Sequence, residues 1–163
     1  MLEVTIEDVD WYVGHWLDEM VAILRRLGDG PANRRPPLPG ANSPFAIVTH
    51  CLGVMEFWAG RMIAGRPIER DRDAEFTATG SIEELVTRVA QARRQLAADL
   101  GSLDPLAPPR HPSQPRDAGL PLATTQGGVV LHVLEELAQH LGQLELTRDL
   151  LVNDGAGGAP QTQ

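Results

Sequence analysis

Three side chains suited to metal binding or acid–base chemistry lie in a leucine-rich stretch near the C-terminus of this 163-residue chain. In HVLEELAQHLGQL, residues 132–144, Glu136 precedes His140 by four positions, and His132 precedes Glu136 by the same interval. Four residues make about one helical turn, so the three side chains would stand one above another on a helix. Such a row could be a metal site, an acid–base pair or an ordinary polar face.

The apolar residues around this row indicate which of its members face a core. On a helix with ~100° between residues, they fall in one sector: Val130, Val133, Leu134, Leu137, Leu141 and Leu144. His140 flanks that sector, Glu136 lies further out, and His132 lies furthest. His140 and Glu136 are therefore predicted to face inward, whereas His132 is predicted to face solvent or a neighbour.

A second apolar stretch, residues 43–58 (SPFAIVTHCLGVMEFW), carries a histidine on its apolar side. His50 there needs a partner, because an unpaired polar group is costly in an apolar environment. It could be a packing histidine bonded to a backbone carbonyl. Alternatively, His50, Glu136 and His140 could supply three ligands to zinc or a similar divalent ion, with coordination positions left for water or substrate.

Other reactive side chains are expected to have structural roles. His15 lies near Asp18 and Glu19 on an amphipathic helix, where a solvated face is the simpler interpretation. Cys51 is expected to be a small buried residue rather than a nucleophile. The tryptophans are expected to lie in the core or to line a pocket: Trp11, Trp16 and Trp58.

Four helical stretches would have to position these groups. The first begins at Thr5, which has an acidic residue three positions later, and ends near Gly28. The second follows Ser43 and Pro44, a favoured N-cap and first-turn pair, and runs from Phe45 to about Ile63. The third opens at Ser81, which with Glu84 has the spacing of a capping box, and ends at Gly101. The fourth runs from Thr124 or Thr125 to about Leu151.

Proline and glycine predict how these helices are connected. Residues 28–43 contain four prolines and three glycines, and residues 101–123 contain six prolines, so both are predicted to be long loops. No stretch has the two-residue period of strands separated by hairpins. The sequence therefore predicts an all-α four-helix bundle with long proline-rich loops. We expect one domain over residues 1–152 and a flexible tail over residues 153–163.

Composition excludes several classes of function. A net charge of −8 argues against a nucleic-acid partner, and no segment resembles a membrane span or an export signal. Cys51 is the single cysteine, so no internal disulfide can form, in keeping with a cytoplasmic protein. All 14 cationic residues are arginines, which removes Schiff-base and P-loop lysines and suggests a GC-rich genome.

Together these motifs resemble a known family. The segment THCLGVMEFWAGRMIAGRP, which contains His50, and the later His132 and Glu136-x-x-x-His140-x-Gly-Gln are similar to the DinB-like superfamily of four-helix metalloproteins, over most of residues 5–151. The usual metal triad of that family is a histidine on the second helix and a His-x-x-x-His pair on the last. Glu136 replaces the first histidine of the pair, a variant that resembles the branch containing mycothiol-dependent maleylpyruvate isomerase. The resemblance implies His50, Glu136 and His140 as metal ligands.

The same resemblance implies a cofactor and a reaction. The metal would be zinc, with nickel as an alternative, and mycothiol would be the thiol cosubstrate. The expected activity is a thiol S-transferase in which a metal-activated thiolate attacks a small electrophile. A hydrolase or isomerase on the same site and a noncatalytic metal-binding stress protein are the alternatives. The isomerase carries an additional C-terminal domain and this sequence ends at Gln163, so S-transfer is the preferred expectation. Whether the protein is a homodimer is left open.

Overall fold

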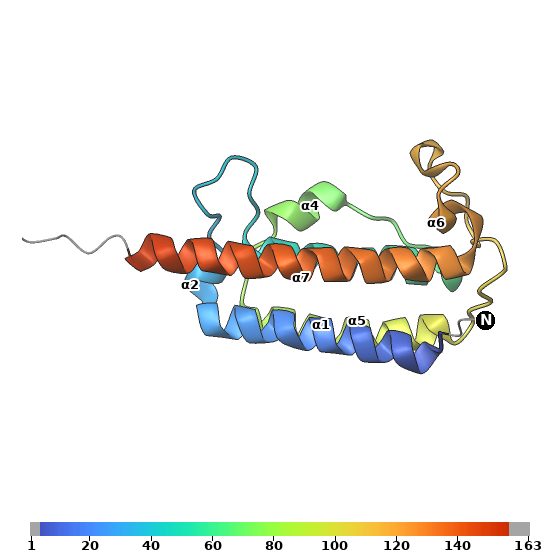
Figure 1. Cartoon of the computed structure of the whole chain (residues 1–163), viewed down its shortest axis with the longest axis horizontal. Helices are drawn as coiled ribbons and strands as arrows, with labels where there is room; N and C mark the ends of the chain where they lie inside the picture. The colour runs from blue at the N-terminus through green and yellow to red at the C-terminus, as the bar shows by residue number, and fades with distance from the viewer. Residues whose placement is uncertain (1–3, 157–163) are drawn as a thin grey trace, which may run out of the picture.

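The computed structural model describes residues 4–156, which form helices and loops without a β-strand. The long helices are α1 (Ile6–Leu27), α3 (Pro44–Met55) with its continuation η1 (Glu56–Ile63), α5 (Ile82–Leu100) and α7 (Gln126–Ala156). As Figure 1 shows, α1 and α7 run in one direction, and α3 and α5 run in the opposite one. Helix α7 packs on both α1 and α3, and α5 packs on the same two helices. The prediction of an all-α helical bundle is confirmed.

Short helices occupy the connections between the long ones: α2 (Asp29–Ala32), α4 (Arg72–Thr77), η2 (Pro115–Asp117) and α6 (Pro121–Thr124). Helix α2 corrects the prediction that residues 28–43 contain no helix. A proline is tolerated in α2 because the first-turn N–H groups of a helix have no partner within the helix. Helix α7 extends to Ala156, beyond the predicted end near Leu151 and into the predicted tail. The remainder of that tail, residues 157–163, lies outside the described residues.

The predicted helix starts are correct, but one of the predicted caps is not. Thr5 and Asp8 form the expected capping box, and Ser43 Oγ accepts a hydrogen bond from the backbone of Ala46. By contrast, the Ser81 side chain does not cap α5. The carboxylate of Asp29 accepts the hydrogen bond of the first α5 residue at 2.9 Å instead. Helix α2 brings this carboxylate to α5, which a pattern local to Ser81 cannot reveal.

The core is mainly apolar, but His50 lies within it. His50 is among the largest fully buried side chains, together with Leu17, Met20, Ile23, Leu24, Ile47, Met55, Met62, Ile63, Leu85, Leu137 and Leu144. Trp58 is buried as expected, and Trp16 packs against the core. Trp11 does not belong to the core, since it is 61 % exposed and stacks on His15 at the rim of a hollow beside α1. It lies off the α1 stripe that buries Val9, Val13 and Leu17.

The second long helix changes its winding at Glu56. The predicted range to about Ile63 is correct, but η1 is a π-helix. Its hydrogen bonds reach back five residues, as in the bond from the backbone N–H of Ala64 to the carbonyl of Ala59 at 2.9 Å. Such wide turns are rare and frequently occur at functional sites. Gly60 lies in this turn, and a Cβ there would overlap the guanidinium of Arg66, so the glycine lets the following segment cross closely.

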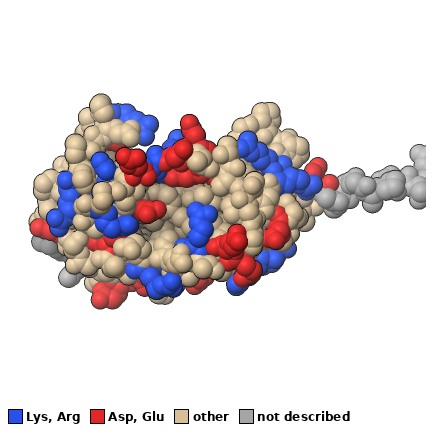
Figure 2. All heavy atoms as spheres, turned by 180° about the vertical axis from the view of Figure 1, so that it is seen from behind, with Lys and Arg blue, Asp and Glu red and all other residues tan. Residues whose placement is uncertain are grey.

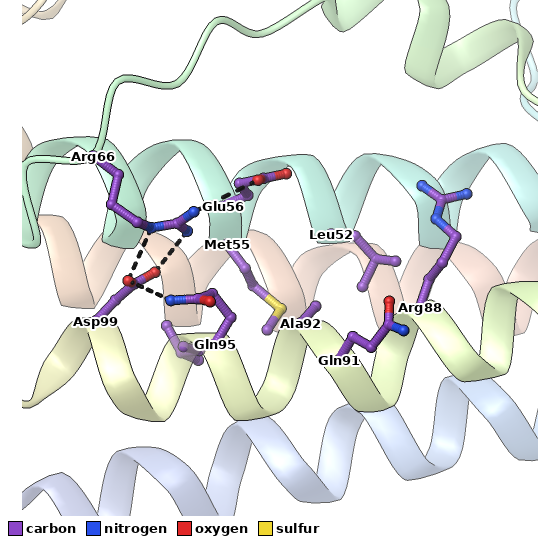
Figure 3. Close-up of a pocket in the computed structure, with 10 residues that line it drawn as sticks. Leu52, Met55, Glu56, Arg66, Arg88, Gln91, Ala92, Gln95 and Asp99 are labelled. Carbon is purple, nitrogen blue, oxygen red and sulfur yellow. Dashed lines mark hydrogen bonds and ion pairs between the residues drawn. The ribbon is translucent and has the colours of Figure 1, made fainter.

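Arg66 fixes the segment that follows η1 to helix α5. Its Nε and Nη2 atoms donate to the two oxygens of Asp99 at 3.0 and 2.9 Å, and Gln95 donates to the same carboxylate (Figure 3). Asp99 is buried at 3 % exposure, so this bidentate pair supplies the partner that a buried charge requires. The anchor holds the chain that continues to Arg70 and α4, which border the site described next.

Arginines and carboxylates are mixed on the outer surface. Seen from behind, over α3, η1 and α5, side chains of both signs lie near one another (Figure 2). Ion pairs such as that of Arg93 with Asp10 join neighbouring helices. In the described part of the chain, none of the helices has the length and apolar character needed to cross a membrane.

Candidate metal centre

His50 lies on α3 and points toward α7. Its side chain is 1 % exposed, and its Nδ1 atom lies 2.8 Å from Oε2 of Glu75. The distance is that of a strong charge-assisted hydrogen bond in which Nδ1–H donates to the carboxylate. The ring of Phe76 stacks on the imidazole with centroids 4.5 Å apart. Helix α4 therefore sets both the tilt and the tautomer of His50, and leaves Nε2 as the free ring nitrogen.

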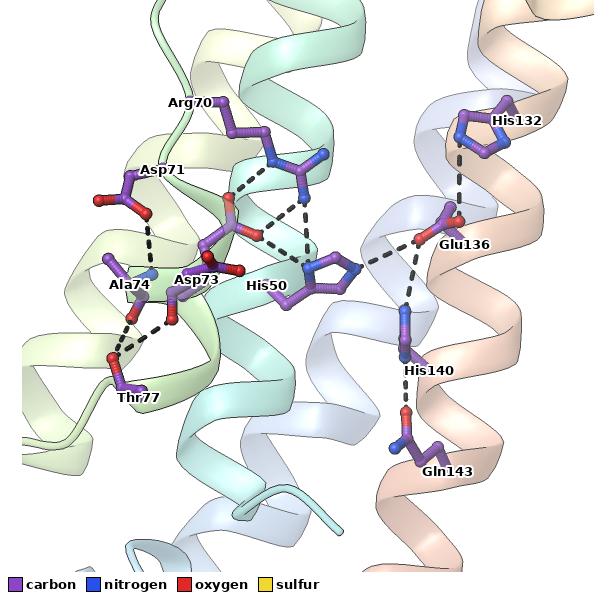
Figure 4. Close-up of polar contacts among 11 residues, drawn as sticks. His50, Arg70, Asp71, Asp73, Ala74, Thr77, His132, Glu136, His140 and Gln143 are labelled. Carbon is purple, nitrogen blue, oxygen red and sulfur yellow. Dashed lines mark hydrogen bonds and ion pairs between the residues drawn. The ribbon is translucent and has the colours of Figure 1, made fainter. Parts of the chain in front are cut away.

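Glu75 is itself held by an arginine and a glycine. Arg70 donates through Nε and Nη2 to its two oxygens at 2.7 and 2.8 Å (Figure 4). A Cβ on Gly53 would overlap Oε1, so this glycine of α3 admits the carboxylate. Burial raises the pKa of Glu75, but the hydrogen bonds from His50 and Arg70 outweigh it and leave that pKa lowered. Glu75 is thus an anion facing His50. Nη2 of Arg70 also approaches Nδ1 at 3.2 Å, but both atoms carry hydrogen in this tautomer, so the contact is not a hydrogen bond.

The other two predicted residues come from α7. Thr125 starts this helix, since its hydroxyl accepts from the backbone of Gly128 at 3.0 Å. His140 donates from Nδ1 to the side-chain oxygen of Gln143 at 2.7 Å, one turn further along. Its Nε2 atom is left facing Glu136, as the row of side chains in Figure 4 shows. Both predicted histidines therefore have Nδ1 bonded to a residue outside the triad and Nε2 directed toward Glu136.

The structure brings the three predicted residues together. Glu136 Oε2 lies 3.3 Å from Nε2 of His50 and 3.4 Å from Nε2 of His140, and all three atoms lie within 4.8 Å of one another. Zn–N and Zn–O bonds of about 2.0–2.1 Å in a tetrahedron separate neighbouring ligand atoms by about 3.3 Å. The two distances from Glu136 match that spacing. Among the described residues this is the one group of three potential ligands with such convergence.

The electrostatics of the group favour positive charge next to Glu136. With both Nδ1 atoms protonated, neutral imidazoles would present two lone pairs to one carboxylate oxygen. Hydrogen bonds from His140 and then His50 lower the pKa of Glu136 far below its ordinary value. Burial lowers the pKa of His50, yet hydrogen bonds with Glu136 and Glu75 outweigh it and leave that pKa raised. Glu136 is therefore an anion, and positive charge between it and the imidazoles, as protons or a metal ion, is stabilised. The two-nitrogen, one-oxygen set suits a divalent metal such as zinc.

Comparison with known proteins places the chain in a family. The model of the DinB superfamily matches residues 12–144, which include the whole triad. The chain belongs to the DinB superfamily. The resemblance inferred from His50, Glu136 and His140 is thus confirmed for the superfamily.

A solved structure shares the fold of this DinB protein. The crystal structure of a conserved protein from Enterococcus faecalis superposes with a TM-score of 0.69 over 93 % of this chain and 99 % of the other. The sequences are 13 % identical, so the match concerns the fold alone. Comparison with curated proteins gives no match.

His132 borders the group of this DinB protein without joining it. Its ring meets Trp58 edge to face with centroids 4.8 Å apart. Nδ1 faces Glu135 at 3.4 Å, and Nε2 lies 3.9 Å from the other oxygen of Glu136. Of the two predicted surroundings, solvent or a neighbour, the structure has a neighbour, the ring of Trp58. His15 is exposed on α1, as the interpretation of a solvated face requires.

Sequence reasoning missed Arg70, Glu75 and Phe76. All three act through His50, and all lie between the second and third predicted helices. Asp71 caps α4 by accepting from the backbone of Ala74 at 3.0 Å, so an N-cap followed by acidic residues was the available signal. Helix α4 spans only Arg72–Thr77, which is too short for a helical period to be recognised.

Proposed function

We propose that this DinB protein is a divalent-metal-dependent thiol S-transferase. Zinc, with nickel as the alternative, would be held by His50, Glu136 and His140. The observation that carries the proposal is the convergence of two Nε2 atoms, from His50 and His140, on one oxygen of Glu136. The Nδ1 atom of His50 is bonded to Glu75, and that of His140 is bonded to Gln143. A divalent ion held by three protein ligands supplies Lewis acidity and an open position, where it lowers the pKa of a bound thiol.

The surrounding residues would hold the three ligands in position through repeated turnover. Glu75 holds the proton on Nδ1 of His50 and fixes the direction of Nε2, and Arg70 holds Glu75. Phe76 and Trp58 cover the imidazoles of His50 and His132 and so limit the access of water. Partners of this kind fix the orientation and basicity of a metal-binding histidine.

Mycothiol is the proposed thiol cosubstrate. This part rests on the Glu-x-x-x-His spacing of residues 136–140, which resembles the mycothiol-dependent branch, and on the GC-rich composition implied by a chain without lysine. In the reaction, the thiol gives up its proton to solvent, and its sulfur lone pair forms a C–S bond with the electrophilic carbon. The leaving group departs from that carbon with the bonding electron pair. The products are the thioether and the leaving group with its electron pair, and solvent keeps the proton.

A conjugation assay on matched variants tests the proposal. Zinc-loaded protein is mixed with 4-chloro-3,5-dinitrobenzoate, with and without mycothiol, and formation of the thioether is followed. Wild-type protein and Glu135→Gln should accelerate the reaction, whereas Glu136→Gln should not. Glu135 is the matched control because it precedes Glu136 directly and its side chain is 71 % exposed.

Two results would contradict the proposal. Equal rates for the Glu135 and Glu136 variants would show that the carboxylate of the triad is not required. Turnover of an ester or amide without thiol, coupled with no mycothiol conjugation, would indicate hydrolysis instead.

A further inference from the structure

A cationic pocket adjoins the metal group. It has a volume of about 430 Å³ and lies between the chain around residues 68–72, η1 and the loop containing η2. Its wall carries the apolar rings of Phe57 and Trp58 and four arginines. We call it the arginine pocket, defined by Trp58, Arg61, Arg70, Arg72 and Arg116. The net charge of the chain is −8, so this concentration of guanidinium groups runs against the overall charge.

Two of these arginines keep donors for a ligand. Arg70 is paired with Glu75, and Arg116 lies 3.8 Å from Asp117. Among the described residues, no carboxylate pairs with Arg61 or Arg72 within the 4.0 Å of an ion pair. Glu69 is the remaining acidic residue in the wall, and it is exposed. The positive charge of the arginines in the pocket wall therefore exceeds the negative charge of the carboxylates there.

The two unpaired arginines are already oriented by other contacts. Arg61 donates from Nη1 to the backbone carbonyl of Ile68 at 3.0 Å, which leaves its other nitrogens available. The guanidinium of Arg72 lies over the ring of Phe76, 5.2 Å from its centroid. A guanidinium held in place loses less conformational entropy when it binds a carboxylate, and it can grip both oxygens at once.

Two aromatic rings link the arginine pocket to the metal group and to the adjacent His132. Phe76 lies between Arg72 and the imidazole of His50, on which it stacks at 4.5 Å. Trp58, in the pocket wall, contacts His132, which lies beside Glu136. A small molecule in the pocket would thus have its apolar part close to aromatic rings that contact His50 and His132.

We propose that the arginine pocket selects organic anions, and that the electrophile carries a carboxylate bound by Arg61 and Arg72 next to an apolar or aromatic body. The inference rests on the proposed function, because it names the class of electrophile that the same site would accept. The tightly paired Arg70 positions Glu75, whereas Arg61 and Arg72 determine specificity.

Calorimetric titration with a matched pair of probes tests the pocket by binding alone. The zinc-loaded protein is titrated with 3-nitrobenzoate and with the neutral 3-nitrobenzamide. The benzoate should bind about tenfold more tightly, and Arg61→Gln and Arg72→Gln should each weaken it by about tenfold, as expected for a lost charge-assisted hydrogen bond. Arg25→Gln is the control, because it removes the same charge from an exposed pair with Glu83. Equal affinity for both probes, or an equal loss in the Arg25 variant, would overturn the proposal.

The same titration on His140→Ala separates this pocket from the metal group. Binding that survives in His140→Ala and falls in Arg72→Gln supports the arginine pocket. Binding that is lost in His140→Ala but survives in Arg72→Gln overturns it, because the carboxylate then binds at the metal group, and the transferase proposal still stands. If binding depends on the arginines but no mycothiol conjugate forms, the proposal for the arginine pocket is supported and the transferase proposal is rejected.

Discussion

A substitution of Glu75 tests whether its carboxylate orients His50 for metal binding. Replacing it by glutamine keeps the size of the side chain and an oxygen that can accept from Nδ1 of His50. The charge is lost, and Arg70 loses the carboxylate that it grips at 2.7 and 2.8 Å. The freed guanidinium remains near the imidazole, where its charge opposes a cation bound through Nε2.

The magnitude follows from these contacts. Changing the 2.8 Å bond from charge-assisted to neutral removes about 1–1.5 kcal/mol, since such bonds contribute roughly 1.5–3 and 0.5–1.5 kcal/mol respectively. That loss is a factor of about ten in the zinc dissociation constant. The unpaired charge of Arg70 adds to it, and carboxylate partners of metal-binding histidines typically contribute 10–100-fold, so Glu75→Gln should weaken zinc binding by about 10–100-fold.

Competition with a zinc-chelating dye near neutral pH measures this effect directly. Glu69→Gln is the matched control, because Glu69 is an exposed glutamate in the same segment and lies outside the ligand group. Thermal denaturation of both variants without metal verifies that they fold. If Glu75→Gln and Glu69→Gln bind zinc equally well, the role assigned to the carboxylate is refuted.

Three further predictions concern the core and the support of the site. Gly53→Ala should lower zinc affinity as Glu75→Gln does while changing stability little, because the new Cβ displaces a flexible carboxylate; unchanged affinity in the dye competition would refute the close approach. Leu137→Ala should lower the free energy of unfolding in urea by about 2–5 kcal/mol, since Leu137 is fully buried, whereas Leu146→Ala, at a 68 % exposed position, should change it by less than about 0.5 kcal/mol. Burial raises the pKa of the Cys51 thiol, so little thiolate forms even at mildly alkaline pH. Mass spectrometry should therefore find alkylation of Cys51 by iodoacetamide only after unfolding. Rapid labelling of the native protein would contradict this prediction.

The predictable part of the site is the part encoded by helical periodicity. Glu136 and His140 share one helix face, and His50 lies on the apolar face of another, so neighbouring helices brought the three together as expected. Glu75 and Arg70 could not be found in this way. They depend on a short helix and on a segment anchored through Arg66, a contact between residues distant in sequence.

Other differences have the same origin in contacts beyond the local pattern. Apolar residues continue through residues 56–63 whether the backbone there is α- or π-helical, so the sequence pattern does not reveal the π-helix. Ser81 has the spacing of a capping box, yet Asp29 supplies the cap because α2 lies against the start of α5. The exposure of Trp11 is a different case, because its position outside the apolar stripe of α1 follows from helical periodicity itself.

We propose that His50, Glu136 and His140 together hold one divalent ion. Equilibrium dialysis of untagged protein against zinc, followed by elemental analysis, tests it most directly. We predict one ion per chain in the wild type and in His132→Ala, and none in His50→Ala, Glu136→Ala or His140→Ala. Stoichiometric zinc in the last three variants, or no zinc in the wild type, would contradict the account.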